Sequence, residues 1–470
     1  MTAIIKPFRF SGNVKAPASK SHTIRRLFMA ALTDGVSEIE NPLDSLDTRS
    51  CLSVCRVLGA EIAEIFEEDD HAKTQRRKVW RVTGKSPEFL RAFAKICDAG
   101  NSGTTLFLGL AAASLGSESV EFDGDNSLKS RSAGHLLDAL AGLGVSVKSA
   151  PNGCIPITVC GPWKGGRVSI SCPTSQYLSA LLLAAPLAPA GVITEIDVPL
   201  LNERPYIEMT LSYLESQDIK YEASADFSYF RISGGNEYKP ISGPVPADFS
   251  SAAFPAAAAA ISGGSVTLLG LDPDDLQGDK AFFCFLEKMG CRIQWEQVPL
   301  QRGISFEPLI PAELMAIGVQ APELFFAEWQ LNVSRSGPLR GGEFDLNDTP
   351  DLFPALAAVA AFAKGETILY NAAHARIKET DRISVMAAEL KKLGVKTAER
   401  PDGLVIYGNG GLTPNASGGF IKLNGHGDHR IVMALAAAAL GCGAPVEIEG
   451  AEAAAVSWPG FLELLNCTTA

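Results

Sequence analysis

The chain has 470 residues, of which 41 are Lys or Arg and 53 are Asp or Glu, so its formal net charge is −12. This acidic balance argues against nucleic acid as a general partner, and the length favours two domains. The first segment, MTAIIKPFRF, lacks the long apolar stretch of a secretory signal. No apolar run reaches the roughly 18 residues that a membrane span needs. We therefore expect a cytoplasmic protein with no nucleic acid or membrane partner.

In chain order, six segments of the sequence resemble one another. Each begins with polar residues, continues into an Ala- and Leu-rich run, stops at a glycine and leads into a short alternating strand. The six runs end at Gly35, Gly116, Gly191, Gly263, Gly365 and Gly443. Repetition at a similar interval indicates a fold built from repeated supersecondary units. Because the runs are apolar on all sides, they predict helices that are buried all round and end at glycine.

A second helix follows in most of these units. Segments such as AGHLLDALAGLGVSV and DRISVMAAELKKLGVKT have amphipathic helical periodicity, stop at a Leu-Gly pair and continue as a strand. A unit is therefore strand, buried helix, strand, amphipathic helix and strand, and three units suffice for a domain of roughly two hundred residues. The longest interval contains residues 300–343, which we interpret as an enlarged hairpin or an insertion.

Polar residues gather where the buried helices begin. A helix N-terminus offers free N–H groups and the positive end of the helix dipole, which suit an anion. The alternative is that the Ser, Thr, Asp and Asn residues here are only N-caps. Nearby cations favour the anion site, because a cap needs no cation whereas a phosphate or carboxylate does. These cations are Lys20, Arg25, Arg376, Lys378, Arg382 and Arg430.

The densest charge cluster is RIKETDR, residues 376–382. A charge run is most often a solvated face. Here, however, Glu379 follows Lys378 and lies one helical turn before Arg382, which suits a carboxylate that is held among cations and moves protons. Asp351, at the start of the fifth buried helix, is a second carboxylate of this sort. Two carboxylates and a lysine form a reasonable acid–base set.

Together these motifs resemble the enolpyruvyl transferase family, and within it the branch that acts on 3-phosphoshikimate. The resemblance covers essentially the whole chain and is carried by SKSHTIRRL, GNSGTTL, SRSAGHLLDAL, TSQYLSALLLAAP, RPYIEMTL, DFSSAAF, TPDLFPALAAVAAFAKG, RIKETDRISVMAAELKKLG and DHRIVMALA. It implies an α/β fold of two domains, each an inside-out α/β barrel of three repeated βαβαββ-type units, which close over a central cleft. One domain would comprise residues 22–243 and the other residues 1–21 with 244–470.

The resemblance also implies an activity. An enzyme of this kind is a transferase that moves the enolpyruvyl group of phosphoenolpyruvate (PEP) to the 5-hydroxyl of 3-phosphoshikimate and releases phosphate. The reaction belongs to the shikimate pathway, which leads to chorismate and the aromatic amino acids. No metal, no organic cofactor and a monomeric state are implied.

The site residues follow from the same resemblance. Asp351 would be the base on the attacked hydroxyl, Glu379 the proton donor to the methylene carbon of PEP, and Lys20 would contact both substrates. The residues that would bind 3-phosphoshikimate are Lys20, Ser21, Arg25, Thr174, Ser175, Gln176, Asp351, His374 and Lys378. Those that would bind PEP are Lys20, Asn101, Gly103, Arg131, Gln176, Arg382 and Arg430. Within the first set, Thr174, Ser175 and Gln176 would bind the 3-phosphate group itself.

Three positions depart from the family pattern. Phe107 stands where the family usually has Arg, Val456 where it usually has Lys, and Glu203 where it commonly has Ser. Two lost cations and one added carboxylate are expected to weaken the binding of PEP or of the phosphate group.

Other functions stay open at this point. The related enzyme that acts on UDP-N-acetylglucosamine usually carries Cys where this chain has Asn126, which disfavours that acceptor. An enolpyruvyl transferase for another hydroxyl acceptor, such as a secondary-metabolite precursor, would tolerate the departures. A non-catalytic phospho-ligand-binding protein would also keep these motifs, although the presence of both Asp351 and Glu379 favours catalysis.

Overall fold

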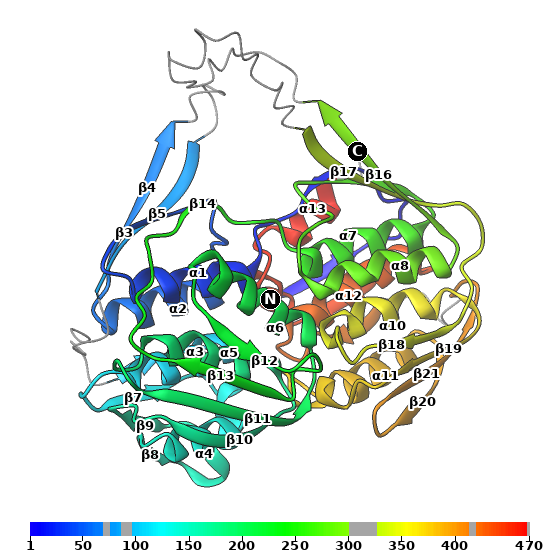
Figure 1. Cartoon of the computed structure of the whole chain (residues 1–470). Coiled ribbons are helices and arrows are strands. Elements are labelled where there is room, and N and C mark those ends of the chain that lie inside the picture. Colours follow the sequence, from blue (N-terminus) through cyan, green and yellow to red (C-terminus); the bar gives the residue numbers. More distant parts are fainter. Residues whose placement is uncertain (69–75, 86–95, 300–326, 413–419, 468–470) are drawn as a thin grey trace, which may run out of the picture.

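The computed structural model describes residues 1–68, 76–85, 96–299, 327–412 and 420–467. These residues form two lobes, each around its own hydrophobic core (Figure 1). The core of the first lobe draws on residues from Ile24 to Val245. The core of the second lobe draws on Ile5 to Ala16 and on Phe249 to Leu465.

The described strands form five four-stranded sheets and one three-stranded sheet. In each four-stranded sheet two neighbours run parallel, and the remaining pairs are antiparallel. The sheet β6-β7-β9-β8 is an example: α3 (Gly103–Ala113) connects the parallel pair β6 and β7, and α4 (Gly134–Gly142) leads on to the antiparallel hairpin. The predicted α/β fold of repeated units is confirmed.

The other elements of the first lobe are α1 (Lys20–Ala31), β3 (Gly35–Glu40), α2 (Leu46–Val57), β4 (Glu61–Glu68), β5 (Arg76–Gly84), β6 (Ile96–Asp98), β7 (Val120–Asp123), β8 (Ser146–Ser149), β9 (Ile157–Cys160), β10 (Gly166–Cys172), α5 (Ser175–Ala184), β11 (Ile193–Leu201), α6 (Arg204–Ser216), β12 (Tyr221–Ala223), β13 (Tyr229–Ser233) and β14 (Ser242–Pro244). Short 3-10 helices are η2 (Leu128–Ser130), η3 (Pro151–Gly153) and η4 (Ala185–Leu187).

The elements of the second lobe are β1 (Thr2–Ile5), β2 (Ser11–Lys15), α7 (Phe249–Ser262), β15 (Ser265–Leu269), α8 (Ala281–Lys288), β16 (Cys291–Pro299), β17 (Ala327–Arg335), β18 (Glu343–Asp345), α10 (Phe353–Ala361), β19 (Lys364–Tyr370), α11 (Arg382–Lys392), β20 (Lys396–Arg400), β21 (Gly403–Asn409), β22 (Ile421–Asn424), α12 (His429–Leu440), β23 (Val446–Glu449) and α13 (Phe461–Cys467). Its 3-10 helices are η5 (Gly278–Lys280), η6 (Pro350–Leu352), η7 (Ala373–Ile377) and η8 (Ala451–Val456). Strands β16 and β17 pair as an antiparallel hairpin, and residues 300–326 of the expected enlarged hairpin lie outside the described residues.

The two lobes exchange one strand each. Strand β2 precedes α1 of the first lobe but pairs in parallel with β15 of the second. Strand β14 precedes α7 of the second lobe but pairs in parallel with β3 of the first. The two crossing segments meet at a bridge between Ala18 and Ala247, where the backbone N–H of Asp248 donates to the carbonyl of Pro17 at 2.8 Å. The lobes are therefore joined by two adjacent segments, which pass directly beside the cleft.

The Ala-rich helices lie inside the lobes, as their sequences predict. Every residue of α12 is buried, and in α7 all residues except the last are buried. Small side chains on every face let neighbouring helices pack closely around these two, which is the arrangement expected for a helix without a polar face. Since the helices are buried along their length, their polar first turns are the parts that reach the cleft.

Candidate active site

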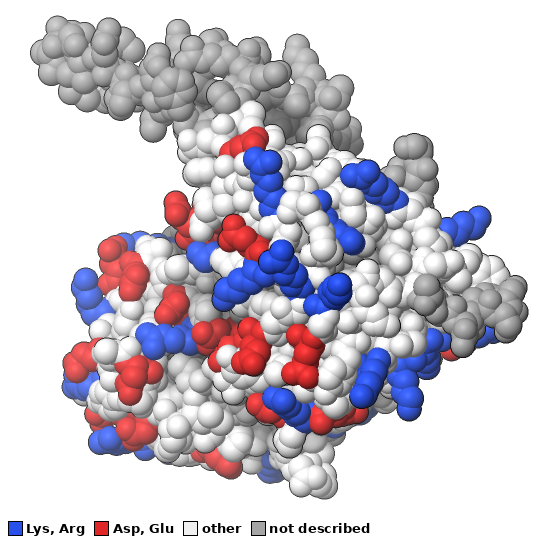
Figure 2. Space-filling view, turned by 90° about the vertical axis from the view of Figure 1, so that its right-hand side faces the viewer, with Lys and Arg blue, Asp and Glu red and all other residues white. Residues whose placement is uncertain are grey.

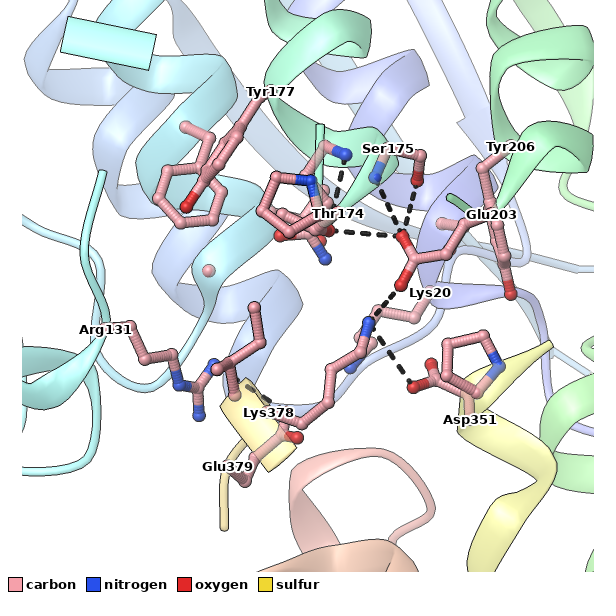
Figure 3. Close-up of a pocket in the computed structure, with 18 of the residues that line it drawn as sticks. Lys20, Arg131, Thr174, Ser175, Tyr177, Glu203, Tyr206, Asp351, Lys378 and Glu379 are labelled. Carbon is pink, nitrogen blue, oxygen red and sulfur yellow. Dashed lines mark hydrogen bonds and ion pairs between the residues drawn. The ribbon is translucent and has the colours of Figure 1, made fainter. Parts of the chain in front are cut away.

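A cavity of about 470 Å³ lies between the lobes (Figure 3). Each of the six buried helices contributes residues at or just before its start to the lining of this cavity: Lys20 and Ser21 for α1, Gly103 and Thr104 for α3, Ser175 and Gln176 for α5, Asp248 and Ser250 for α7, Asp351 for α10, and Arg430 for α12. The repeat thus places six helix N-termini around one space, which is favourable for anions.

On the first-lobe side, the N-terminus of α5 presents neutral donors. Thr174 is the N-cap residue, and its side chain accepts the backbone N–H of Gln176. Ser175 is buried and belongs to the lining of the cavity. Gln176 and Tyr177 continue the lining. These groups are neutral, so they could bind an anion only through oriented dipoles and not through charge.

Arg25 supplies positive charge beneath these donors. Its guanidinium is buried, and the hydrogen bonds that the structure gives it go to hydroxyl and carbonyl oxygens, on Thr210, Ser179, Ser21 and Tyr206. Burial lowers the pKa of Arg25 to about 10, which still leaves it charged at neutral pH. A buried cation that hydrogen-bonds to neutral oxygens favours a negative ligand in the adjoining cavity.

The second-lobe side consists of a charged network. Asp351 lies between two guanidinium groups: Arg382 Nη1 donates to its Oδ1 at 2.7 Å, and Arg430 Nη2 lies 2.9 Å from its Oδ2. Burial disfavours the charge of Asp351, but the neighbouring cations outweigh burial and hold the pKa of this carboxyl well below its usual range. Asp351 is therefore an anion at neutral pH.

Glu379 shares one of these cations. Arg382 Nη2 donates to Glu379, while Arg131 of the first lobe lies 3.8 Å from the same carboxylate. Burial again acts against the charge, yet these two cations hold the pKa of Glu379 well below its usual range. Arg382 itself is buried, and its Nε donates to Asp428 at 2.8 Å. One guanidinium therefore fixes both candidate acid–base carboxylates.

Two lysines line the same cavity. Lys20 Nζ donates to Asp47 at 3.0 Å. Lys378 Nζ donates to Glu203 and lies 3.9 Å from Asp351 (Figure 3). The pair of Lys378 and Glu203 joins the two lobes across the cleft.

Most of the residues that the sequence singled out line this cavity, and three do not. Arg382 lies behind Asp351 and Glu379, and it positions them. Asn101 accepts a hydrogen bond at 2.8 Å from Arg131, which does line the cavity. His374 is buried near Glu203 and Lys378, and burial lowers its pKa.

Several lining residues were not among the sequence candidates. Phe107 contacts Tyr177 edge-on, with ring centroids 4.8 Å apart. A Cβ built on Gly103 would lie 3.4 Å from Phe107 and 3.2 Å from Gln176, so this wall has little spare room. Asp47, Tyr206 and Gln277 also line the cavity. Tyr206 could have been found from the RPY motif, whereas nothing in the sequence connects Asp47 with Lys20. Val456, in η8, is buried and is not part of the lining.

Within the described ranges, no group of three or more His, Cys, Asp or Glu is arranged to hold a metal ion. In the same part of the chain, no helix has the length and apolarity to cross a membrane.

The chain is similar to known proteins over nearly its whole length. The model of the family EPSP synthase (3-phosphoshikimate 1-carboxyvinyltransferase) matches residues 4–465. The 3-phosphoshikimate 1-carboxyvinyltransferase of Acetivibrio thermocellus is 42% identical over 463 residues, which cover 98% of this chain and 97% of the relative. That of Halobacterium salinarum is 37% identical and covers 99% of this chain and 98% of its own. The solved structure of EPSP synthase from Acinetobacter baumannii superposes with a TM-score of 0.74, at 26% identity, over 99% of this chain and 98% of that one.

Proposed function

Since the chain belongs to the EPSP synthase family, we propose that the cavity between its lobes holds PEP and 3-phosphoshikimate during enolpyruvyl transfer. The chain is a transferase of the shikimate pathway: it moves the enolpyruvyl group of PEP to the 5-hydroxyl of 3-phosphoshikimate and releases phosphate. The observation that carries the location is the meeting of α5 donors with the Asp351 and Glu379 network in one cavity.

The roles of the two carboxylates are part of this proposal. Asp351 takes the proton of the attacked hydroxyl as the new C–O bond forms, and this proton passes to the phosphate group when the bond between the central carbon and the phosphate oxygen breaks. Glu379 gives a proton to the methylene carbon of PEP. Because the product keeps its methylene group, that proton leaves again when phosphate departs, and Glu379 takes it back. Oxygen atoms of both carboxylates also stabilise positive charge that develops at the central carbon.

Glu379 must be protonated to act as an acid, whereas its surroundings keep it ionised. The charge of the substrate would change this. The pKa of Glu379 is held low by Arg382 and Arg131. PEP carries a phosphate and a carboxylate, and these anions would bind at Arg131, Arg430 and Lys20. Their negative charge offsets the cations and raises the pKa of Glu379, so that it can act as an acid. The acid is therefore prepared by the substrate that it protonates.

Domain boundaries at 22–243, and at 1–21 with 244–470, are likewise proposed. The separate cores and the crossing segments near Ala18 and Ala247 support them. Closure of the cleft on substrate binding would exclude water from the network. A cytoplasmic location, a monomeric state and the lack of a nucleic acid partner are also proposals. The net charge of −12 supports the last of these, as does the face in Figure 2, where basic side chains lie close to acidic ones.

The test is phosphate release by the purified protein. With PEP and 3-phosphoshikimate together, we expect inorganic phosphate to appear at a rate that depends on both. UDP-N-acetylglucosamine in place of 3-phosphoshikimate is the control and should give none. Release with UDP-N-acetylglucosamine would contradict the proposal, and so would the absence of release with both acceptors.

A further inference from the structure

The carboxylate of Glu203 occupies the donors at the N-terminus of α5 (Figure 3). Its Oε2 accepts the backbone N–H of Ser175 at 2.9 Å, the Ser175 hydroxyl at 2.7 Å and the Thr174 hydroxyl at 3.1 Å. Its Oε1 accepts from Lys378 of the second lobe. Only 3% of the residue is exposed. One carboxylate thus takes a helix N-terminus, two hydroxyls and an ammonium group.

The local backbone does not explain this placement. Glu203 is the N-cap residue of α6, yet its side chain makes no capping hydrogen bond to that helix. It has a φ of 59° and a ψ of 43°, in the left-handed region that is unfavourable for a residue with a side chain. The side chain is therefore held by what it contacts at α5, and those contacts offset a backbone penalty.

The same donors are those that a phosphate monoester requires. A phosphate binds best where backbone N–H groups at a helix start, hydroxyls and a cation converge. Resting on the function proposed above, we infer that Glu203 sets the acceptor specificity of this enzyme, because its carboxylate competes with the phosphate of 3-phosphoshikimate for Ser175, Thr174 and Lys378.

The competition follows from charge and from the supply of donors. The Ser175 N–H and hydroxyl each have a single proton to donate, so they cannot fully serve two anions. Two anions at this distance would also repel each other. Lys378, despite burial, holds the pKa of Glu203 below its usual range, and the carboxylate stays charged at neutral pH. The phosphate of the acceptor must therefore turn the side chain of Glu203 away, and this lowers the affinity for the phosphorylated acceptor.

The experiment compares the wild type with Glu203→Ser and Glu203→Gln in steady-state kinetics. We expect the KM for 3-phosphoshikimate to fall about tenfold in Glu203→Ser. The donors that Glu203 occupies become available to the phosphate, and a hydrogen bond to a charged group is strong enough to give a change of this size. Glu203→Gln, which removes the charge but not the bulk, should give a smaller fall. The kcat and the KM for PEP should change little in both. Glu208→Ser is the matched control, because Glu208 lies on the same helix, is only half-buried and pairs with Arg204.

Unphosphorylated shikimate separates competition from a general change of the cleft. Its apparent affinity, measured by calorimetry, should be the same in the wild type and in Glu203→Ser. An unchanged or higher KM for 3-phosphoshikimate in a folded Glu203→Ser protein would overturn the inference, as would an equal gain for shikimate. If Glu203→Ser does not fold, Glu203→Gln carries the same comparison.

Calorimetry also keeps this inference separate from the proposed function. Should the wild type release no phosphate with PEP and 3-phosphoshikimate, the proposed function fails. Tighter binding of 3-phosphoshikimate by Glu203→Ser than by the wild type would still support the competition. Equal or weaker binding would refute it.

Discussion

The two sides of the cleft are built from different chemistry. The first-lobe side presents hydroxyl and N–H donors at the start of α5, and its buried Arg25 hydrogen-bonds to neutral oxygens. The second-lobe side presents carboxylates that share the guanidinium groups of Arg382 and Arg430. The hydroxyl and N–H dipoles keep the same protonation state when an anion binds. The pKa values of carboxylates paired with cations change when a charged ligand arrives. Under the proposed function, the first side would mainly bind the acceptor and the second would mainly transfer protons.

The largest expected effect tests the charged side. Glu379→Gln should lower kcat by about 10² to 10⁴, the usual contribution of a positioned acid or base, and should change 3-phosphoshikimate affinity only a few-fold. Phosphate release and calorimetry measure the two quantities. Glu343→Gln, an exposed glutamate of the same lobe, is the control. A nearly normal rate in Glu379→Gln would refute the proton-transfer role.

An intermediate effect tests the first-lobe side. Ser175→Ala removes one donor to the phosphate and should raise the KM for 3-phosphoshikimate by about tenfold, the cost of a hydrogen bond to a charged group, with kcat little changed. Ser169→Ala, in the exposed part of β10, is the control. The effect should be greater in the Glu203→Ser background, because the wild-type hydroxyl also serves Glu203. A fall in kcat with constant KM would break the division between the two sides.

The smallest effect concerns the contact between the lobes, where Tyr206 donates to Asp279 at 2.8 Å. Burial, aided by the charge of Asp351, raises the pKa of Asp279 to about 7. A raised carboxyl pKa contributes stability that is complete below about pH 4 and is lost as pH rises through 7. Asp279→Asn should therefore raise the melting temperature by a few degrees at pH 8 and hardly at all at pH 4. Thermal unfolding at both pH values measures this, and parallel shifts at the two would contradict it.

Local sequence patterns predict the repeat, whereas the assignment of residues 1–21 to the second domain rests only on the family resemblance. Polar starts, apolar runs and stopping glycines are local signals, and they recur in each unit. The partner of β2 is β15, about 250 residues along the chain, and no local pattern in β2 indicates which lobe it joins. Strand pairing across such a separation depends on the packing of whole units.

The candidate site shows the same limit. Helix starts and the RIKETDR cluster indicated where chemistry would gather, because capping residues and cations are legible in order along the chain. The position of Arg382 behind Asp351 and Glu379 could not be predicted from the sequence, because it depends on three separate segments that meet only in the folded structure. Glu203 was visible only as a departure from a family pattern. Its partners, Ser175 and Lys378, lie 28 and 175 residues away.

The exchanged strands also have a consequence for synthesis on the ribosome. The residues that form the core of the first lobe have all been made once translation reaches residue 245. Strand β2 must then wait for β15, which at 5 to 20 residues per second takes roughly 10 to 50 s after β2 itself is made. Strand β1 waits longer still, because it pairs with β23 near residue 449. The earliest part of the chain to be translated is thus among the last to find its place, and it has to stay unpaired while a finished lobe forms beside it.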